Sequence, residues 1–281
     1  MIHNSPHHFV IFEKFPAQNS LKTIKYPIEG LGEFLESKYL RYNTQDFIEN
    51  DPVCIPHLFT AKADIEISGF LSATISWGQR KTIIRNARQM MEWMDYSPFD
   101  FIMGATDVET ERFRNFRHRT FSGEDCIFFL RSLRNIYQQF GGLEDLFRMP
   151  QAMDEQEVIN RIMNFRKIFL RWPHERRSEK HISNPECGSA AKRINMFLRW
   201  MVRKDHSGVD FGIWKDISSA NLICPLDIHT GRVSRELGLL SRRQNDWKAA
   251  IELTESLKLL CPEDPVRYDY ALFGLGIYEN F

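Results

Sequence analysis

Three features that mark other classes of protein are missing from this 281-residue chain: a long apolar run, a secretion signal and closely spaced cysteines. No apolar run approaches the roughly 18–20 residues that span a membrane as a helix. The first residues lack the basic and then apolar pattern of a signal peptide, because Glu13 and Lys14 fall within the short apolar stretch there. We therefore expect a cytoplasmic protein that has no membrane partner.

The five cysteines are an odd number, and no two of them are close in sequence. This spacing disfavours a disulfide framework, a zinc site built from cysteine pairs and an iron–sulfur cluster with clustered ligands. We therefore expect reduced thiols, no metal site and no cofactor. The cysteines are Cys54, Cys126, Cys187, Cys224 and Cys261.

Charge is balanced over the whole chain, with 37 basic and 37 acidic residues, but it is unevenly placed. From Arg161 to Lys204 twelve residues are basic and three are acidic, a local charge of +9. Such a run is often only the solvated face of helices. It also suits a DNA-binding surface, because phosphate contacts supply much of the affinity for DNA.

Apolar residues recur at helical spacing along most of the chain, and no convincing strand alternation appears. The predicted fold class is therefore all-α, a compact multi-helix array. Residues 1–27 show little periodicity, and we expect them to be a poorly ordered extension. The expected helices lie near Leu31–Tyr39 and over residues 63–76, 82–94, 123–140, 155–172, 189–203, 228–239, 245–260 and 265–276.

One short stretch, CPLDIHTGRV at residues 224–233, places a proline and a carboxylate just before an expected helix. Asp227 stands at the N-cap position of that helix, where the helix dipole favours an ionised carboxylate. One interpretation is that Asp227 only caps the helix. The other gives the charged group a chemical role, and the basic helix upstream favours it.

A second helix start carries a lysine. Gly188 and Ser189 lead into Lys192 and Arg193, and a small-residue loop at a helix N-terminus is suited to bind phosphate through backbone N–H groups. Lys192 and Asp227 together would make an amine nucleophile with a carboxylate partner. The alternative is that Lys192 is an ordinary exposed or phosphate-binding lysine, and spacing alone does not separate it from Lys180 or Lys204.

The stretch CPLDIHTGRVSRELGL resembles the part of the helix-hairpin-helix DNA glycosylases that carries their essential aspartate. Asp227 falls on that aspartate, with His229, Arg232 and Val233 in register. Tyr268–Gly276 is similar to the last core helix of that superfamily, and Ala63–Gln79 is weakly similar to an early one. The resemblance is greatest to the 8-oxoguanine glycosylases of the archaeal type and to a bacterial family of similar length.

This chain also departs from the pattern. The usual Leu-Pro-Gly-Val-Gly hairpin is absent, and Lys192 precedes Asp227 by 35 residues, which is longer than a two-helix hairpin needs. The resemblance implies one domain over residues 28–281, with an irregular hairpin and an active site in a cleft between two lobes. The first lobe would comprise residues 28–76 and 228–281, and the second residues 77–227.

The activity that the resemblance implies is removal of an oxidised purine, such as 8-oxoguanine, from double-stranded DNA by a monomeric enzyme. Lys192 would attack the sugar C1′ of a flipped nucleotide, and Asp227 would stabilise the developing positive charge. The resulting Schiff base would allow strand cleavage by β-elimination, which is an AP lyase activity.

The remaining site residues divide into two groups. Core packing is the alternative role for each aromatic, and capping or packing for His229. The predicted base-binding residues are Gln79, Trp77, Pro225, Trp200 and Phe273, with Phe197 and Trp214 as further stacking candidates. The predicted DNA-backbone-binding residues are Gly188, Ser189, Arg193, His229 and Arg232.

Two other functions fit the same sequence. The chain could be a non-catalytic helical protein that binds DNA on the same scaffold, because fold does not fix function. It could also be a helical interaction protein whose basic face meets an acidic partner. A protein of this last kind would show no salt-dependent binding to DNA, whereas both DNA-binding candidates would.

Overall fold

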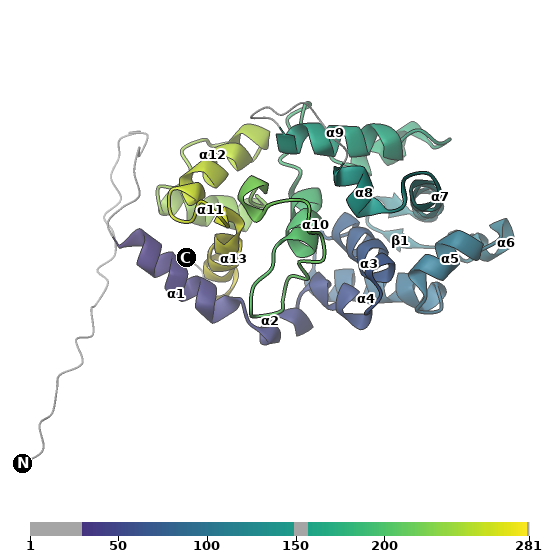
Figure 1. Cartoon of the computed structure of the whole chain (residues 1–281), viewed down its shortest axis with the longest axis horizontal. Coiled ribbons are helices and arrows are strands. Elements are labelled where there is room, and N and C mark those ends of the chain that lie inside the picture. Colours follow the sequence, from purple (N-terminus) through teal and green to yellow (C-terminus); the bar gives the residue numbers. More distant parts are fainter. Residues whose placement is uncertain (1–29, 149–156, 280) are drawn as a thin grey trace, which may run out of the picture.

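The computed structural model describes residues 30–148, 157–279 and 281 (Figure 1). It is 64% helix and 2% strand, which confirms the all-α prediction. The predicted extension, residues 1–27, lies outside the described residues. Within the described part of the chain, no helix is long and apolar enough to cross a membrane.

The elements follow one another along the chain with short connections. The α-helices are α1 (Leu31–Tyr42), α2 (Gln45–Glu49), α3 (Lys62–Thr74), α4 (Arg80–Trp93), α5 (Pro98–Gly104), α6 (Asp107–Thr110), α7 (Gly123–Phe140), α8 (Leu143–Arg148), α9 (Glu157–Phe169), α10 (Lys192–Val202), α11 (Ile228–Glu236), α12 (Trp247–Lys258) and α13 (Asp269–Tyr278). The 3-10 helices are η1 (Pro52–Cys54), η2 (Pro56–Leu58), η3 (Glu111–Phe113), η4 (Arg176–His181), η5 (Ser219–Asn221) and η6 (Pro265–Tyr268). The strands are β1 (Arg117–His118) and β2 (Phe121–Ser122).

Local capping signals place most helix ends. Helix α7 has the bounds that periodicity predicts, and its start is a capping box in which Ser122 and Asp125 each bind the other's backbone N–H. Helix α10 differs, because it begins at Lys192 and not at residue 189. Ala191 has a left-handed φ of 52°, so the chain turns there before the helix can start.

A short hairpin corrects the expectation that the chain holds no strand. Strands β1 and β2 pair antiparallel, with Arg117 opposite Ser122 and His118 opposite Phe121. Arg119, in the connecting turn, has a left-handed φ of 53°. Two residues per strand are too few to give an alternating sequence pattern, which explains why the hairpin escapes prediction.

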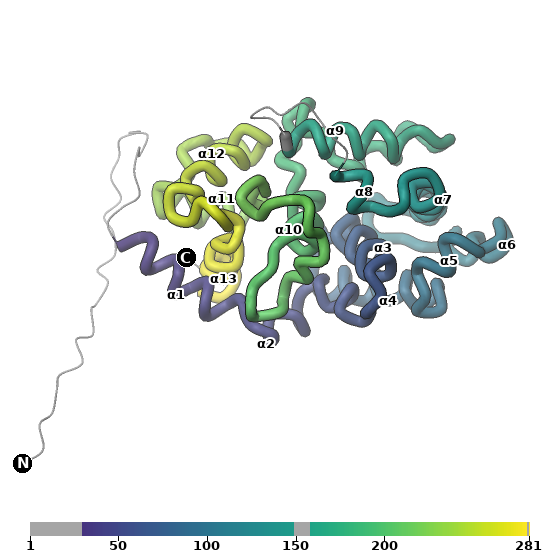
Figure 2. Tube along the Cα trace, viewed as in Figure 1, coloured from purple at the N-terminus to yellow at the C-terminus, as the bar shows by residue number. Residues whose placement is uncertain are grey.

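The helices gather at two ends of the molecule, with α10 between them (Figure 1). Helix α1 packs along α13, which also packs against α11, so segments from the two ends of the described chain lie side by side (Figure 2). Helix α3, assigned to the first lobe by the prediction, packs against α4, α5 and α10. The division into two lobes stays a prediction.

Stacked phenylalanines form the core on the α3 side of the molecule. Phe70 of α3 contacts the rings of Phe129, Phe165, Phe169 and Phe197, whose centroids lie 5.4–6.0 Å away. Aromatic pairs at such distances stabilise a fold beyond the area that they bury. This packing fixes α10 against α3 and so sets the position of the residue at the start of α10, Lys192.

The chain after α10 folds back onto the helix that precedes it. The backbone N–H groups of Phe211 and Trp214 donate to the carbonyls of Trp200 and Met201, at 2.8 and 3.0 Å. Arg203 binds Asp210 at 3.0 Å in the same loop. These contacts take up the long interval between Lys192 and Asp227 and return the chain toward the start of α10.

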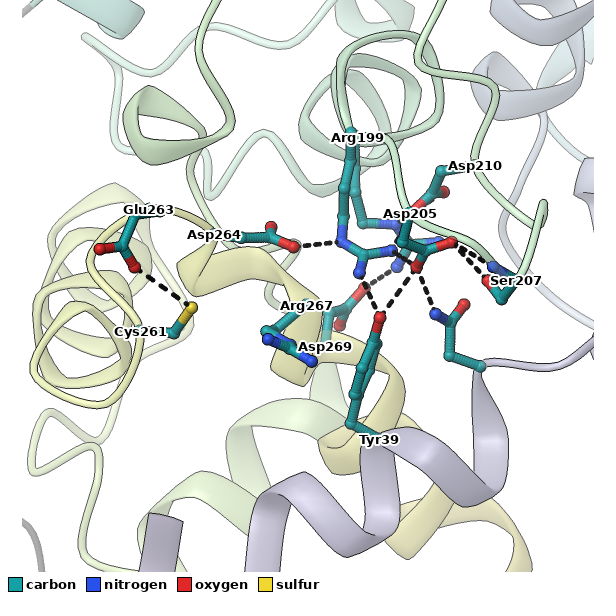
Figure 3. Close-up of polar contacts among 12 residues, drawn as sticks. Tyr39, Arg199, Asp205, Ser207, Asp210, Cys261, Glu263, Asp264, Arg267 and Asp269 are labelled. Atoms are coloured by element: carbon teal, nitrogen blue, oxygen red, sulfur yellow. Dashed lines mark hydrogen bonds and ion pairs between the residues drawn. The ribbon is translucent and has the colours of Figure 1, made fainter. Parts of the chain in front are cut away.

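A buried network of charges anchors this loop to both ends of the molecule (Figure 3). Arg203 is 1% exposed, and its guanidinium binds Asp264 at 2.8 Å and the hydroxyl of Tyr39 at 2.7 Å. Arg199 pairs with Asp210 and Asp269. Burial alone would lower the pKa of both guanidinium groups, but the surrounding carboxylates raise it above its ordinary value.

Candidate active site

The structure brings Lys192 and Asp227 together. The Lys192 Nζ atom lies 3.3 Å from the Asp227 Oδ2 atom, although the two residues come from the starts of different helices, α10 and α11. Their side chains are 29% and 22% exposed, so the ion pair is open to solvent on one side. An amine and a carboxylate in this arrangement can exchange a proton or act on the same bound molecule.

Asp227 caps its helix as predicted. Its Oδ1 atom accepts hydrogen bonds from the backbone N–H groups of His229, at 2.9 Å, and Thr230, at 3.0 Å. Burial raises the pKa of this carboxyl, but Lys192 and the backbone of Thr230 lower it by more, so the net pKa lies below its ordinary value. The Oδ2 atom faces Lys192, and one carboxylate therefore serves both the helix and the ion pair.

A pocket of about 610 Å³ opens beside this ion pair. Trp77, Pro225 and Phe273, three of the predicted base-binding residues, line it together with Lys192 and Asp227. A volume of several hundred Å³ with mostly apolar walls and a few polar groups is typical of a small-molecule site. The pocket can accept a group about as large as one nucleotide base next to the amine.

The two aromatic residues of the pocket are held by their neighbours. The ring of Trp77 lies 5.9 Å from that of His181 in a stacked arrangement, and the Arg193 guanidinium lies 4.8 Å from its centroid. The Arg80 guanidinium lies 4.8 Å from the centroid of Phe273. These cation–π contacts fix the ring planes that face the pocket.

Two buried carboxylates of the pocket escape the sequence-based prediction. Asp269, at the start of α13, raises its pKa to about 6 because burial outweighs the opposing effect of Arg199. Asp51 caps η1, and burial also raises its pKa. Asp269 precedes Phe273 by four residues, so helical spacing puts both on one face. That spacing was the available signal.

Several predicted base-binding residues do not line the pocket. Trp200 is fully buried in α10, so this prediction is wrong. Phe197 is also fully buried, and Trp214 is 2% exposed and donates its indole N–H to Glu66. The core-packing alternative therefore holds for these three residues. Gln79 is exposed at the start of α4 but does not line the pocket either.

The loop before α10 is tighter than a free phosphate-binding loop. The N–H of Gly188 donates to Pro185 and that of Ser189 to Asn184, so these two predicted donors are already occupied. Arg193 donates to the carbonyl of Thr74 from a largely buried position. These bonds argue against a direct phosphate contact by the three residues. No side chain caps the first turn of α10 itself.

The other two predicted backbone-binding residues lie on α11. His229 is exposed and lines the pocket mouth, a position open to a phosphate. The guanidinium of Arg232 donates to the carbonyl of Gly276 at 3.3 Å and lies 3.7 Å from Glu236. Arg232 therefore holds α11 against α13, and it does not line the pocket.

The basic run from Arg161 to Lys204 is not one exposed stripe. Arg199 and Arg203 are buried, and Arg166 pairs with Glu179 at 3.1 Å. Lysines of this run such as Lys204 remain exposed. The local charge of +9 thus overstates the positive surface that a partner meets.

No group of three or more histidine, cysteine, aspartate or glutamate residues suited to a metal occurs in the described ranges. Comparison with known proteins gives one match, over residues 51–278, to a family whose description reads "Protein of unknown function (DUF2400)". Neither a curated protein nor a solved structure matches the chain. The matched residues include the whole pocket wall from Asp51 to Phe273.

Proposed function

We propose that this chain, which belongs to the DUF2400 family, is a DNA glycosylase that removes an oxidised purine and then cleaves the strand as an AP lyase. The observation that supports this proposal is the 3.3 Å pair of Lys192 and Asp227 at the wall of a base-sized pocket. The same arrangement gives a non-catalytic DNA-binding protein no use for an amine beside a carboxylate. The proposed enzyme acts as a monomer, in the cytoplasm, on double-stranded DNA.

The proposed reaction begins at the sugar of a flipped nucleotide. Lys192, after giving up one proton, forms a bond to C1′ while the bond from C1′ to the base breaks. The base leaves with the bonding electrons and takes up a proton. Asp227 stays ionised through this step because its pKa is lowered, so it stabilises the positive charge that develops on the sugar.

Strand cleavage follows from the same intermediate. The sugar ring opens as the bond from C1′ to O4′ breaks, O4′ takes a proton, and a Schiff base to Lys192 remains. Loss of a proton from C2′ then expels the 3′ phosphate. The Schiff base makes this elimination possible because it accepts the electrons released at C2′.

The pocket walls support a purine as the removed base. Trp77 and Phe273 present aromatic surface on which a flipped base can stack, and stacking contributes roughly 1–3 kcal/mol per base. Asp269 offers a carboxylate among these apolar groups, where it can accept a hydrogen bond from a ring N–H. An oxidised purine such as 8-oxoguanine gains such an N–H at N7.

Borohydride trapping tests the proposal. The protein is incubated with duplex DNA that contains 8-oxoguanine and is then reduced, which converts a Schiff base into a stable covalent adduct. We expect an adduct with the unchanged protein and none with Lys192→Gln. The matched controls Lys180→Gln and Lys204→Gln remove other lysines of the same basic run and should keep the adduct.

The outcomes separate the candidate functions. Salt-dependent DNA binding without an adduct on any lesion or abasic site would favour the non-catalytic DNA-binding protein. No salt-dependent binding at all would favour the helical interaction protein. An adduct that survives Lys192→Gln but is lost in Lys180→Gln would move the nucleophile to Lys180.

A further inference from the structure

Asn245, in the connection between α11 and α12, contacts the pocket and the backbone of Asp227. Its side-chain Nδ2 atom donates to the Asp227 carbonyl at 2.9 Å, and its Oδ1 atom accepts from the Arg235 guanidinium at 2.5 Å. Asn245 also lines the pocket. The Asp227 carbonyl accepts a second bond from the N–H of Gly231, so both of its lone pairs are used.

The approach of Asn245 depends on a glycine in α11. A Cβ atom at Gly231 would lie 2.7 Å from Asn245 Oδ1 and 2.9 Å from Arg235 Nη1. Real side chains do not tolerate such contacts without a shift of the neighbouring atoms. Gly231 therefore leaves the space in which Asn245 reaches the first turn of α11.

The two residues after Asn245 bind the other half of the site. Asp246 pairs with Ser189 as an isolated antiparallel bridge, and the N–H of Trp247 donates to the Gly188 carbonyl at 3.2 Å. Ser189 is three residues before Lys192. Three consecutive residues, 245–247, thus hold both the loop that leads into Lys192 and the helix start that carries Asp227.

We infer that Asn245 is a positioning residue, which sets the distance between Lys192 and Asp227 without contacting the reacting atoms. This inference rests on the proposed function for its effect on catalysis. The geometry itself does not depend on that function, because the contacts are those of the protein alone. Loss of the Asn245 bond frees the first turn of α11 to move away from Lys192.

Two variants isolate this role. Asn245→Ala removes both hydrogen bonds, and Asn245→Asp keeps an acceptor for Arg235 but loses the donor to the Asp227 carbonyl. Gln244→Ala is the control, because Gln244 is an exposed amide next in the chain whose side chain contacts only Arg242 among the hydrogen bonds above. Thermal unfolding of each variant establishes that it is folded.

The first measurement requires no activity. An amine-reactive N-hydroxysuccinimide ester labels lysines, and mass spectrometry follows the labelling rate of Lys192. We expect that rate to rise about two- to fivefold in Asn245→Ala and Asn245→Asp, because the amine is released from the Asp227 carboxylate. Gln244→Ala should label at the unchanged rate. Equal labelling of Lys192 in all four folded proteins would overturn the inference, whatever the protein does to DNA.

The second measurement tests the link to catalysis. We expect the single-turnover rate of adduct formation to fall roughly 10- to 100-fold in Asn245→Ala, since small misplacements of reacting groups are that costly. The Kd for duplex DNA should not change. A raised Kd with an unchanged rate would make Asn245 a DNA contact and overturn the inference. If the unchanged protein forms no adduct, the proposed function fails, and the labelling result still decides the positioning role.

Discussion

Helix α10 presents two kinds of ion pair, and their surroundings differ sharply. At its start, Lys192 has one carboxylate partner and faces a pocket. Two turns later, Arg199 has two carboxylate partners and is 4% exposed. A buried charge needs several partners to offset its desolvation, whereas a charge at a pocket wall keeps bonding capacity for a ligand. The difference separates a structural role for the buried network from a chemical role for the open pair.

The largest expected effect is on the buried side of this comparison. Arg203→Ala leaves Asp210 and Asp264 without their shared cation in the protein interior. The free energy of unfolding should fall by about 3–5 kcal/mol, as measured by denaturant titration. Lys204→Ala, an exposed neighbour, should change it by less than about 0.5 kcal/mol. A loss below about 1 kcal/mol in Arg203→Ala would show that the network does not anchor the fold.

The next effect is on catalysis at the open pair. Asp227→Asn keeps a good N-cap but loses the negative charge, so the rate of adduct formation should fall by roughly 100- to 1000-fold. Stability should change by less than about 1 kcal/mol. Asp227→Ala should lose a similar factor in rate and about 1 kcal/mol more in stability, because the cap is also removed. Equal rates for Asp227→Asn and the unchanged protein would reduce Asp227 to a helix cap.

Asp269 joins the two regions, because it binds Arg199 and also lines the pocket. Its pKa is raised to about 6, so the folded protein holds this proton more tightly than the unfolded chain does. This contribution to stability is complete below about pH 4 and is lost as the pH rises through 6.

Denaturant titrations at several pH values test this sign. Between pH 4 and pH 7 the unchanged protein should lose about 1–3 kcal/mol of unfolding free energy relative to Asp269→Asn, which has no proton to release. Parallel stability curves for the two proteins would mean that Asp269 is not the group that links the network to the pocket.

The smallest expected effect is on the stability of the open pair. Lys192→Gln should change the free energy of unfolding by less than about 1 kcal/mol, because a partly exposed ion pair with one partner contributes little. Denaturant titration beside Arg203→Ala measures the contrast directly. A loss comparable to that of Arg203→Ala would erase the distinction between the two kinds of ion pair.

Local sequence signals predict much of the fold and half of the site. The N-cap role of Asp227 follows from an Asp before an apolar helix, and the bounds of α7 follow from its capping residues and spacing. Trp200 was misassigned because both faces of α10 are covered, so helical periodicity does not tell which aromatic meets a pocket. Only tertiary packing decides that.

The contact between Lys192 and Asp227 was out of reach of local reasoning. It depends on acids far along the chain, such as Asp210 and Asp264, that pull the loop after α10 back onto Arg203. It also depends on Asp246, which pairs with the loop before α10. The resemblance suggested the pair, but the spacing of 35 residues gave no reason for it to close.

The most direct test of the account is to map the trapped adduct. The protein is reduced with borohydride on duplex DNA containing 8-oxoguanine, digested and examined by mass spectrometry for the lysine that carries the sugar fragment. The account predicts that the fragment is attached to Lys192. A fragment on any other lysine, or none on a panel of oxidised purines and abasic sites, would contradict it.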